Sequence, residues 1–284
     1  MNKNKIIHMV AGLPRSGSTL LMNILGQNPE FYVTPTSGIL DILLQVRNSW
    51  DKNSAFRAMD AGKSEDIKRN VLKAILHTYF EHVEQSICFD KNRGWPGYLE
   101  MMAELCGGKS NIKVLLTVRD LRDVVASFER LHRKTAALGL THQEYANPKK
   151  FRTAIGRLET FIDQDQPVGR AFNIIRDAYT RGWNDQIHIV EYDRLTSNPK
   201  DTMKSIYNFL GHPIFEHDFN DVKRLTIEDD SVHGFKELHV IRPQVEPQTP
   251  NWPVVFDEVV RREPVWEQIE MTAQFWREYQ INND

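Results

Sequence analysis

The stretch KIIHMVAGLPRSGSTLLMNILGQNP, residues 5–29, decides the fold of this chain. It begins with a mostly apolar run, which is typical of a strand covered on both faces. A loop with Gly12 and Gly17 follows, and apolar residues then recur at helical spacing until Gly26 and Pro29. The predicted order is strand, tight loop and helix. The two loop glycines let consecutive backbone N–H groups converge on an anion.

This loop nearly matches the nucleotide-binding pattern G-x-x-x-x-G-K-[ST], in which the Lys reaches the outer phosphates. Ser18 stands where that Lys would be, and Arg15 is the nearest cation. Ser16, Ser18 and Thr19 add hydroxyl donors, and Pro14 precedes the Arg. We therefore expect an anion-binding loop that does not handle ATP in the usual way. An ordinary strand–helix turn is the alternative.

Strand and helix patterns alternate along the rest of the chain, which favours βαβ units and a parallel sheet. Further strands are expected at 31–35, 86–92, 113–120 and 187–195. Helices are expected from Ser37, at 64–83 with Ser64 as the capping signal, and at 98–106, 120–134 with Asp120 as N-cap, 171–183, 198–211 and 265–280. The polar stretch 51–63 is expected as a loop. We predict one α/β domain over 1–284, with insertions at about 36–85 and 135–170 and an irregular segment over 212–284.

Composition limits the class of protein. The 284 residues are 40% hydrophobic and 26% charged, with a net charge of −2, which argues against a nucleic-acid-binding protein. Cys88 and Cys106 are too few for a disulfide framework and favour buried free thiols in a reducing compartment. No Cys/His cluster suggests a metal site. The N-terminal apolar run is too short for a signal peptide, and no run could span a membrane. A cytoplasmic location is expected.

Polar side chains follow several of the expected strands, at the edge where ligands bind in such sheets. Lys91 follows one strand, Arg119 ends another, and Tyr192 ends a third. Each has a simpler alternative: a solvated Lys, an ion pair of the Arg with Asp120 or Asp123, and a Tyr that caps the core. Taken together, they predict a rim that holds a small molecule with several phosphate groups.

Three motifs resemble sulfotransferases that use 3′-phosphoadenosine 5′-phosphosulfate (PAPS), especially tyrosylprotein and bacterial sulfotransferases. GLPRSGSTLL (12–21) resembles their 5′-phosphosulfate loop. VRDLRDVVASF (118–128) resembles their 3′-phosphate motif, with Arg119 and Ser127 in the matching places. VEYDRLTSNPKDTMKSIYNFLG (190–211) is similar to a third block. The resemblance implies a three-layer fold related to P-loop NTPases, with a central parallel sheet flanked by helices.

The resemblance also implies the reaction. A hydroxyl of an acceptor, or less readily an amine, would take the sulfuryl group in line, and 3′-phosphoadenosine 5′-phosphate (PAP) would leave without help from a metal. Lys91 and Arg15 would stabilise charge on the bridging oxygen. Arg242, in a segment that resembles a late cofactor-binding segment of the family, is a weaker candidate for a cation that contacts phosphate, and Lys236 is weaker still. Contacts to the cosubstrate are expected from Pro14, Arg15, Ser16, Gly17, Ser18, Thr19, Arg119, Ser127, Tyr192 and Arg242.

The general base of the family is missing at the matching places. Tyrosylprotein sulfotransferases have a Glu where this chain has Thr36, and cytosolic sulfotransferases have a His where it has Arg93. Candidate substitutes are Asp41, His132, His233 and His239. A base supplied differently, or an acceptor acidic enough to need none, stays open.

Two other functions remain open from the sequence. One is a nucleoside or small-molecule kinase of related fold, which would want the missing Lys and a Mg²⁺-binding acid. The other is a degenerate relative that binds PAP without turnover. A sugar, a lipid headgroup, a phenol or a peptide would each suit the sequence as the acceptor, and the oligomeric state is not specified.

Overall fold

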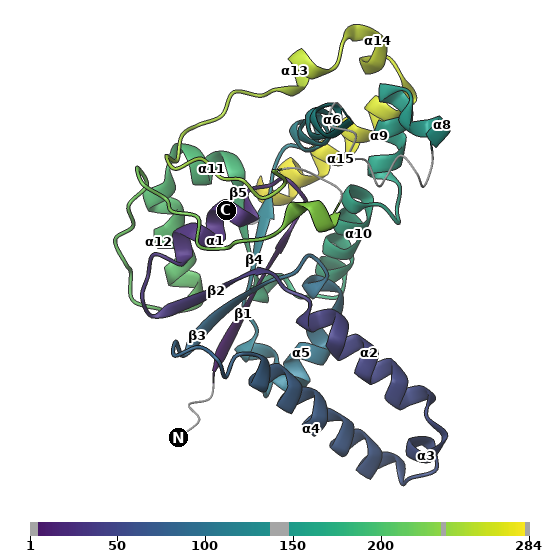
Figure 1. Ribbon diagram of the computed structural model, residues 1–284, viewed down its shortest axis with the longest axis vertical. Coiled ribbons are helices and arrows are strands. Elements are labelled where there is room, and N and C mark those ends of the chain that lie inside the picture. Colours follow the sequence, from purple (N-terminus) through teal and green to yellow (C-terminus); the bar gives the residue numbers. More distant parts are fainter. Residues whose placement is uncertain (1–4, 137–147, 234–236, 282–284) are drawn as a thin grey trace.

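A five-stranded sheet forms the centre of the computed structural model, which describes residues 5–136, 148–233 and 237–281 (Figure 1). The strands are β1 (Ile6–Gly12), β2 (Phe31–Thr36), β3 (Ile87–Lys91), β4 (Val114–Val118) and β5 (Ile187–Glu191). Their order across the sheet is β2-β3-β1-β4-β5, and all neighbours pair in parallel. The parallel α/β fold predicted from the sequence is confirmed.

Helices connect the strands and cover both faces of the sheet. The α-helices are α1 (Ser18–Leu25), α2 (Ile39–Lys52), α3 (Ser54–Arg57), α4 (Ala61–Tyr79), α5 (Leu99–Leu105), α6 (Leu121–Ala136), α8 (Pro148–Phe151), α9 (Ala154–Ile162), α10 (Pro167–Thr180), α11 (Tyr192–Ser197), α12 (Pro199–Leu210), α13 (Trp252–Val255), α14 (Glu258–Arg261) and α15 (Pro264–Ile281). Short 3₁₀ turns are η1 (Trp95–Tyr98), η2 (Lys109–Asn111), η3 (Asn184–Gln186) and η4 (Asp230–His233).

The two central strands are buried on both faces, which explains their continuous apolar character. Met9 of β1 and Leu116 of β4 join the hydrophobic core formed with α4, α5, α6 and α10. Their neighbours Val10 and Leu115 join the opposite core formed with α1 and α12. The three-layer arrangement is thus a consequence of the alternation of side chains along each strand.

The stretch 51–63, predicted as a loop, is largely helical, so that prediction is wrong. It contains the end of α2, all of α3 and the start of α4, which form an arm that extends from the body (Figure 1). Asp60 caps α4 by accepting a hydrogen bond from Lys63 N over 3.0 Å. Ser64, the predicted cap, lies inside the helix and accepts a hydrogen bond from Trp50 Nε1 over 3.0 Å. The exposed polar residues of this stretch made it resemble a loop, although contacts between neighbouring helices stabilise it as helix.

Other boundaries shift by a few residues. The strand predicted over 187–195 ends at Glu191, because Tyr192 begins α11. Asp120 does cap α6, since its Oδ1 accepts a hydrogen bond from Arg122 N over 2.9 Å. The segment 135–170 contains α8 and α9 and the start of α10, while 137–147 lies outside the described residues. The prediction of a single domain stays a prediction.

After α12 the chain returns to the edge of the sheet as a largely irregular segment. We call its described residues, 213–233 and 237–251, the strap. The strap pairs with itself where Val222 N donates to Pro243 O over 2.7 Å, and Asn23 of α1 binds it from below. In Figure 1 it passes beside α1, above the carboxyl ends of the strands.

Cys88 is buried and Cys106 half-buried, and both are free thiols. Burial raises the pKa of each thiol to about 11, so both stay protonated at neutral pH. Among the described residues, no helix is both long and apolar enough to cross a membrane.

Candidate active site

The loop between β1 and α1 curls tightly against β4. Arg15 and Gly17 both have left-handed backbones, with φ of 61° and 90°. A Cβ on Gly12 would lie 2.2 Å from the carbonyl oxygen of Thr117, so only glycine allows this approach. A non-glycine residue such as Arg15 adopts this conformation at a cost of about 1 kcal/mol, which is typical of functional loops.

The side chain of Ser16 fastens this loop to β4. Its hydroxyl is 2.7 Å from Thr117 Oγ1 and 3.0 Å from the Thr117 carbonyl, and it also contacts the carbonyl of Leu13. The residue is fully buried and does not line the cavity next to the loop. The sequence predicts that this hydroxyl contacts a phosphate. In the structure it binds Thr117 instead and holds the loop against β4.

A cavity of about 790 Å³ lies beside the loop at the carboxyl ends of the strands, which is a volume typical of small-molecule sites. Lys91 and all the other residues expected to contact the cosubstrate line it: Pro14, Arg15, Gly17, Ser18, Thr19, Arg119, Ser127, Tyr192 and Arg242. The strap closes its outer side, with Leu238, His239 and residues 240–242 and 244–249 in the wall. The structure thus brings together side chains that the sequence predicts at separate strand ends.

One end of the cavity gathers positive charge around Arg15. Arg15 Nε donates a hydrogen bond to Ser127 Oγ over 3.1 Å, and Arg119 lies close enough for its NH1 to be 3.5 Å from the Arg15 carbonyl oxygen. Burial and the charge of Arg119 lower the pKa of Arg15, and Arg130 adds to this effect. Cations that destabilise one another in a cavity favour a bound anion.

Arg119 is held over an aromatic ring. Its guanidinium carbon is 4.3 Å from the ring centroid of Tyr192, a cation–π contact. Its nearest approach to Asp123 is 4.0 Å, and Asp120 pairs with Arg122 instead, at 2.6 Å. The ion pair with Asp123 that the sequence offers as the alternative is thus present, at the upper limit of ion-pair distance, alongside the cation–π contact. Its buried Nε has no hydrogen-bond partner within the described ranges.

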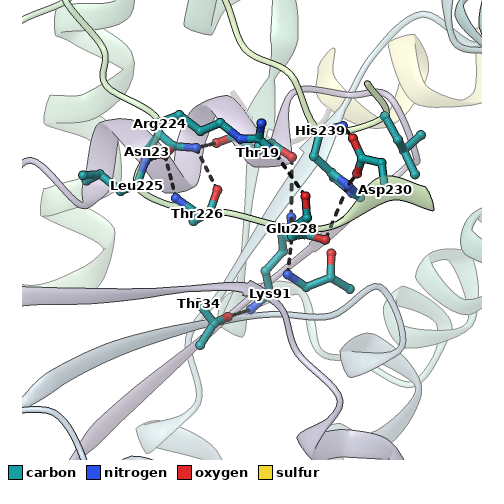
Figure 2. A network of polar contacts seen from close by, with 12 residues as sticks. Thr19, Asn23, Thr34, Lys91, Arg224, Leu225, Thr226, Glu228, Asp230 and His239 are labelled. Carbon is teal, nitrogen blue, oxygen red and sulfur yellow. Dashed lines mark hydrogen bonds and ion pairs between the residues drawn. The ribbon is translucent and has the colours of Figure 1, made fainter. Parts of the chain in front are cut away.

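Lys91 ends β3 and lines the same cavity, so it is no solvated surface residue. Its Nζ lies 2.7 Å from Glu228 Oε1 and 3.5 Å from Thr19 Oγ1 (Figure 2). Its side chain is only 7% exposed. Burial lowers the pKa of Lys91, and the hydrogen bond with Glu228 opposes that effect.

Glu228 is a site residue that the sequence did not reveal. It lies on the strap, and its Oε1 also accepts a hydrogen bond from Thr36 N over 2.9 Å. Although burial opposes it, the hydrogen bonds with Lys91 and Thr36 hold the pKa of this carboxyl below its usual range. Thr36 stands where the related enzymes have a Glu, and the carboxylate of Glu228 binds its backbone. Glu228 lies on a segment without strand or helix periodicity, so nothing in the sequence indicated this contact.

The candidate bases are distributed unevenly. His239 lines the cavity, and its Nδ1 lies 2.6 Å from Asp230 Oδ1. Burial lowers the pKa of His239, whereas Asp230 raises it, with burial the larger effect. Asp41 is exposed on α2 and His132 packs against Phe151 at a ring distance of 5.5 Å, and neither lines the cavity. His233 ends η4, and Lys236 lies outside the described residues.

Arg242 contacts Gln248 within the strap. Arg93, which stands where a His would be expected, also lines the cavity. Among the side chains that the structure describes, no group of three or more His, Cys, Asp or Glu residues could hold a metal ion.

The fold and the cavity together define an α/β protein with a glycine-containing loop after its first strand. The cavity beside that loop is lined by the cations Arg15, Lys91 and Arg119, an arrangement that suits an anionic ligand. The model of the Sulfotransferase family matches residues 9–217, and the chain therefore belongs to the sulfotransferase family. Protein-tyrosine sulfotransferase of Drosophila melanogaster is 25% identical over 218 residues, 75% of this chain and 39% of that protein. Protein-tyrosine sulfotransferase 2 of Gallus gallus is 27% identical over 216 residues, 74% of this chain and 52% of that protein. The matched region thus spans about half or less of these relatives.

Solved structures support the fold. The sulfotransferase domain from the curacin biosynthetic pathway has a TM-score of 0.55 at 16% identity, over 98% of this chain and 99% of that one. The sulfotransferase domain from the Synechococcus PCC 7002 olefin synthase has a TM-score of 0.55 at 18% identity, over 97% of this chain and 95% of that one. At these identities the likeness concerns the fold alone.

Proposed function

We propose that this protein transfers the sulfuryl group of PAPS to a hydroxyl of an acceptor and releases PAP. One observation carries the proposal above all. Arg15, Arg119, Ser127 and Lys91 all line a single cavity. Family membership supports the same reaction. An amine acceptor would need the same arrangement.

The cationic end of the cavity suits the 3′-phosphate, which PAPS carries and ATP lacks. Arg119 and Ser127 would bind it, and the buried Nε of Arg119 that lacks a partner among the described residues fits an anionic ligand. A guanidinium suits phosphate because it offers several donors in one plane. Tyr192 holds Arg119 in place and would also lie against the nucleotide.

The part of the cavity next to Lys91 and the loop between β1 and α1 suits the transfer itself. Negative charge grows on the bridging oxygen as the bond between sulfur and that oxygen breaks, and donors placed in advance at that oxygen lower the barrier. Lys91 and Arg15 would supply charge, and backbone N–H groups at the start of α1, with Ser18 and Thr19, would bind the 5′-phosphate. Lys91 must leave Glu228, at least in part, to do so.

Related structures bind PAP. A retinol dehydratase that was solved with androsterone and the inactive cofactor PAP has a TM-score of 0.50 at 14% identity, over 94% of this chain. The kinase alternative has less support, because Ser18 occupies the place of the phosphate-binding Lys. A PAP-binding protein without turnover is the remaining alternative, which the following experiment distinguishes.

Two measurements test the proposal. Thermal unfolding is followed with PAP and with ATP–Mg²⁺, and labelled PAPS is then incubated with a panel of alcohols, phenols, sugars and tyrosine peptides. We expect PAP to raise the midpoint and label to move to a panel member. Stabilisation by ATP–Mg²⁺ alone would indicate a kinase, and PAP binding without transfer would indicate a binding protein.

The nature of the acceptor stays open between a peptide and a small molecule, since the named relatives act on protein tyrosines. The cytoplasmic location, the lack of a nucleic-acid partner and the lack of a metal requirement stay predictions.

A further inference from the structure

The strap brings a buried carboxylate into contact with Lys91 (Figure 2). Glu228 Oε1 is 2.7 Å from Lys91 Nζ and 2.9 Å from Thr36 N, and its side chain is 8% exposed. Lys91, Thr36 and His239, which surround this carboxylate, all line the cavity. A base has to lie within hydrogen-bond reach of the reacting hydroxyl, and a carboxylate next to the transfer Lys meets that condition more closely than exposed Asp41 or packed His132.

The position of Glu228 is fixed by several independent contacts. Asn23 of α1 accepts hydrogen bonds from Leu225 N and, over 3.0 Å, from Thr226 N, and donates to Thr226 Oγ1 over 2.9 Å (Figure 2). On the other side, Glu228 Oε2 lies 3.4 Å from His239 Nδ1. A group held this firmly is suited to catalysis, because little reorganisation is needed during the reaction.

We propose that Glu228 is the group that removes the proton from the acceptor hydroxyl. The proposal rests on the proposed sulfuryl transfer. As the acceptor oxygen bonds to sulfur, its proton passes to the Glu228 carboxylate. The bond between sulfur and the bridging oxygen breaks, and its electron pair stays on the phosphate of PAP. Glu228 later returns the proton to solvent, so no further reactant is needed.

Lys91 links this proton transfer to the presence of the cosubstrate. In the structure the ammonium of Lys91 neutralises Glu228. When Lys91 turns to the bridging oxygen, the carboxylate loses its cation and gains an anionic neighbour, and both changes increase its affinity for a proton. The base is therefore activated only when PAPS occupies the cavity.

The other charged groups around Glu228 do not replace Lys91. The nearest are His239 and Asp230, and Asp230 binds both Nδ1 and the backbone N–H of that His, at 2.6 Å and 3.0 Å. Arg224 donates to the backbone carbonyl of Glu228 over 3.3 Å and not to its carboxylate. We assign the pair of Asp230 and His239 a positioning role.

Glu228→Gln tests the proposal, because Gln keeps the shape and an oxygen that accepts from Thr36 N. Glu216→Gln is the control, since Glu216 lies on the same strap with an exposed side chain 3.5 Å from Lys200. PAP affinity is measured by calorimetry, and turnover of PAPS is measured from pH 5 to pH 9 with the acceptor that the panel identifies, or with water.

We expect Glu228→Gln to bind PAP within about threefold of the unchanged protein and to lose about a hundredfold or more in kcat. We also expect the fall in kcat at acidic pH to disappear, since kcat reports the proton affinity of Glu228 while PAPS is bound. A variant that keeps kcat within fivefold, or keeps the acidic limb, overturns the proposal. Loss of the limb in His239→Asn but not in Glu228→Gln would assign the role to His239 and equally overturn it.

A second readout does not depend on turnover. Calorimetry of PAP binding near pH 6 in two buffers of different ionisation enthalpy gives the number of protons taken up. We expect Glu228→Gln to take up fewer protons than the unchanged protein and the Glu216→Gln control. Equal uptake in all three overturns the proposal. If none of the proteins binds PAP, the proposed function itself fails, which is a distinct result.

Discussion

At the scale of single residues, the assignment of the 3′-phosphate depends on Arg119. This guanidinium lies over Tyr192 and only loosely near Asp123, so a phosphate would be its main ionic partner. We predict that Arg119→Ala weakens PAP binding by more than tenfold, or about 1.4 kcal/mol, but leaves the weaker binding of adenosine 5′-phosphate nearly unchanged. Calorimetry with both nucleotides measures this, with Arg69→Ala on α4 as the control. Equal losses for both nucleotides would contradict the assignment.

Lys91 should behave differently from Arg119. Its ammonium already has an anionic partner in Glu228, so the cosubstrate gains little ground-state binding by taking it over. The stabilisation is realised mainly as charge grows on the bridging oxygen. We predict that Lys91→Ala lowers kcat by about a hundredfold or more and changes PAP affinity by less than tenfold. Parallel measurements of turnover and calorimetry decide this, and a loss confined to binding would remove the catalytic role.

Residues that lie directly after a strand could be predicted, and residues on the strap could not. Lys91, Arg119 and Tyr192 lie at or directly after the ends of strands, and parallel strands bring such positions to one edge. The direction of the Ser16 hydroxyl depends on Thr117, more than a hundred residues away in the sequence. Glu228 reaches Lys91 because its neighbours Leu225 and Thr226 bind α1 and its own carboxylate binds Thr36 N of β2, and these contacts leave no periodic pattern in the sequence.

At the scale of elements, the turn from β1 into α1 requires glycine at position 17. The backbone there has φ of 90°, and a Cβ would lie 2.5 Å from Cδ2 of Tyr192. We predict that Gly17→Ala lowers the free energy of unfolding by at least about 1 kcal/mol and displaces the ring that supports Arg119, so that PAP binding also weakens. Urea unfolding and calorimetry measure both effects. Gly62→Ala on α4 is the control, since its Cβ would meet only Asp60 Oδ1 at 3.5 Å.

The elements that the sequence predicted well are those whose burial follows their own period. The strand β4 and the helix α12 lie within a residue or two of their predicted bounds. The arm of α2, α3 and α4 was mistaken in part for a loop, because its polar residues are exposed while Trp50 stacks on Phe56 at 3.7 Å. Such contacts between neighbouring short helices stabilise an element without giving it a periodic apolar face.

At the scale of the whole molecule, the distribution of charge predicts a reaction without a metal. The cations Arg15, Lys91 and Arg119 line the cavity, so protein side chains can neutralise the charge that grows on the leaving phosphate. We predict that EDTA leaves the turnover of PAPS unchanged and that added Mg²⁺ does not increase it. Release of PAP, followed by chromatography with and without chelator, measures this. Loss of turnover on chelation that Mg²⁺ restores would contradict the prediction.

The buried side-chain amide of Asn23 also fastens the strap to α1. Asn23 is fully buried, donates to Thr19 O over 2.7 Å, and binds Thr226, which lies 203 residues away in the sequence. Removing this amide leaves backbone and hydroxyl groups of α1 and the strap without partners in the interior. We predict that Asn23→Ala lowers the free energy of unfolding by roughly 2 to 3 kcal/mol.

The same substitution should also affect turnover, because the strap that Asn23 fastens carries Glu228 to Lys91. We expect kcat to fall more than PAP affinity, since the loop and Arg119 keep their own supports. Gln27→Ala is the matched control: Gln27 also binds the strap, through both backbone groups of Asp218 at 2.7 Å and 2.9 Å, but it does so near the surface. Water can replace the lost partners there, so its effect on unfolding should stay below about 1 kcal/mol. Equal stability and equal turnover in the two variants would mean that the strap reaches Lys91 without the buried anchor.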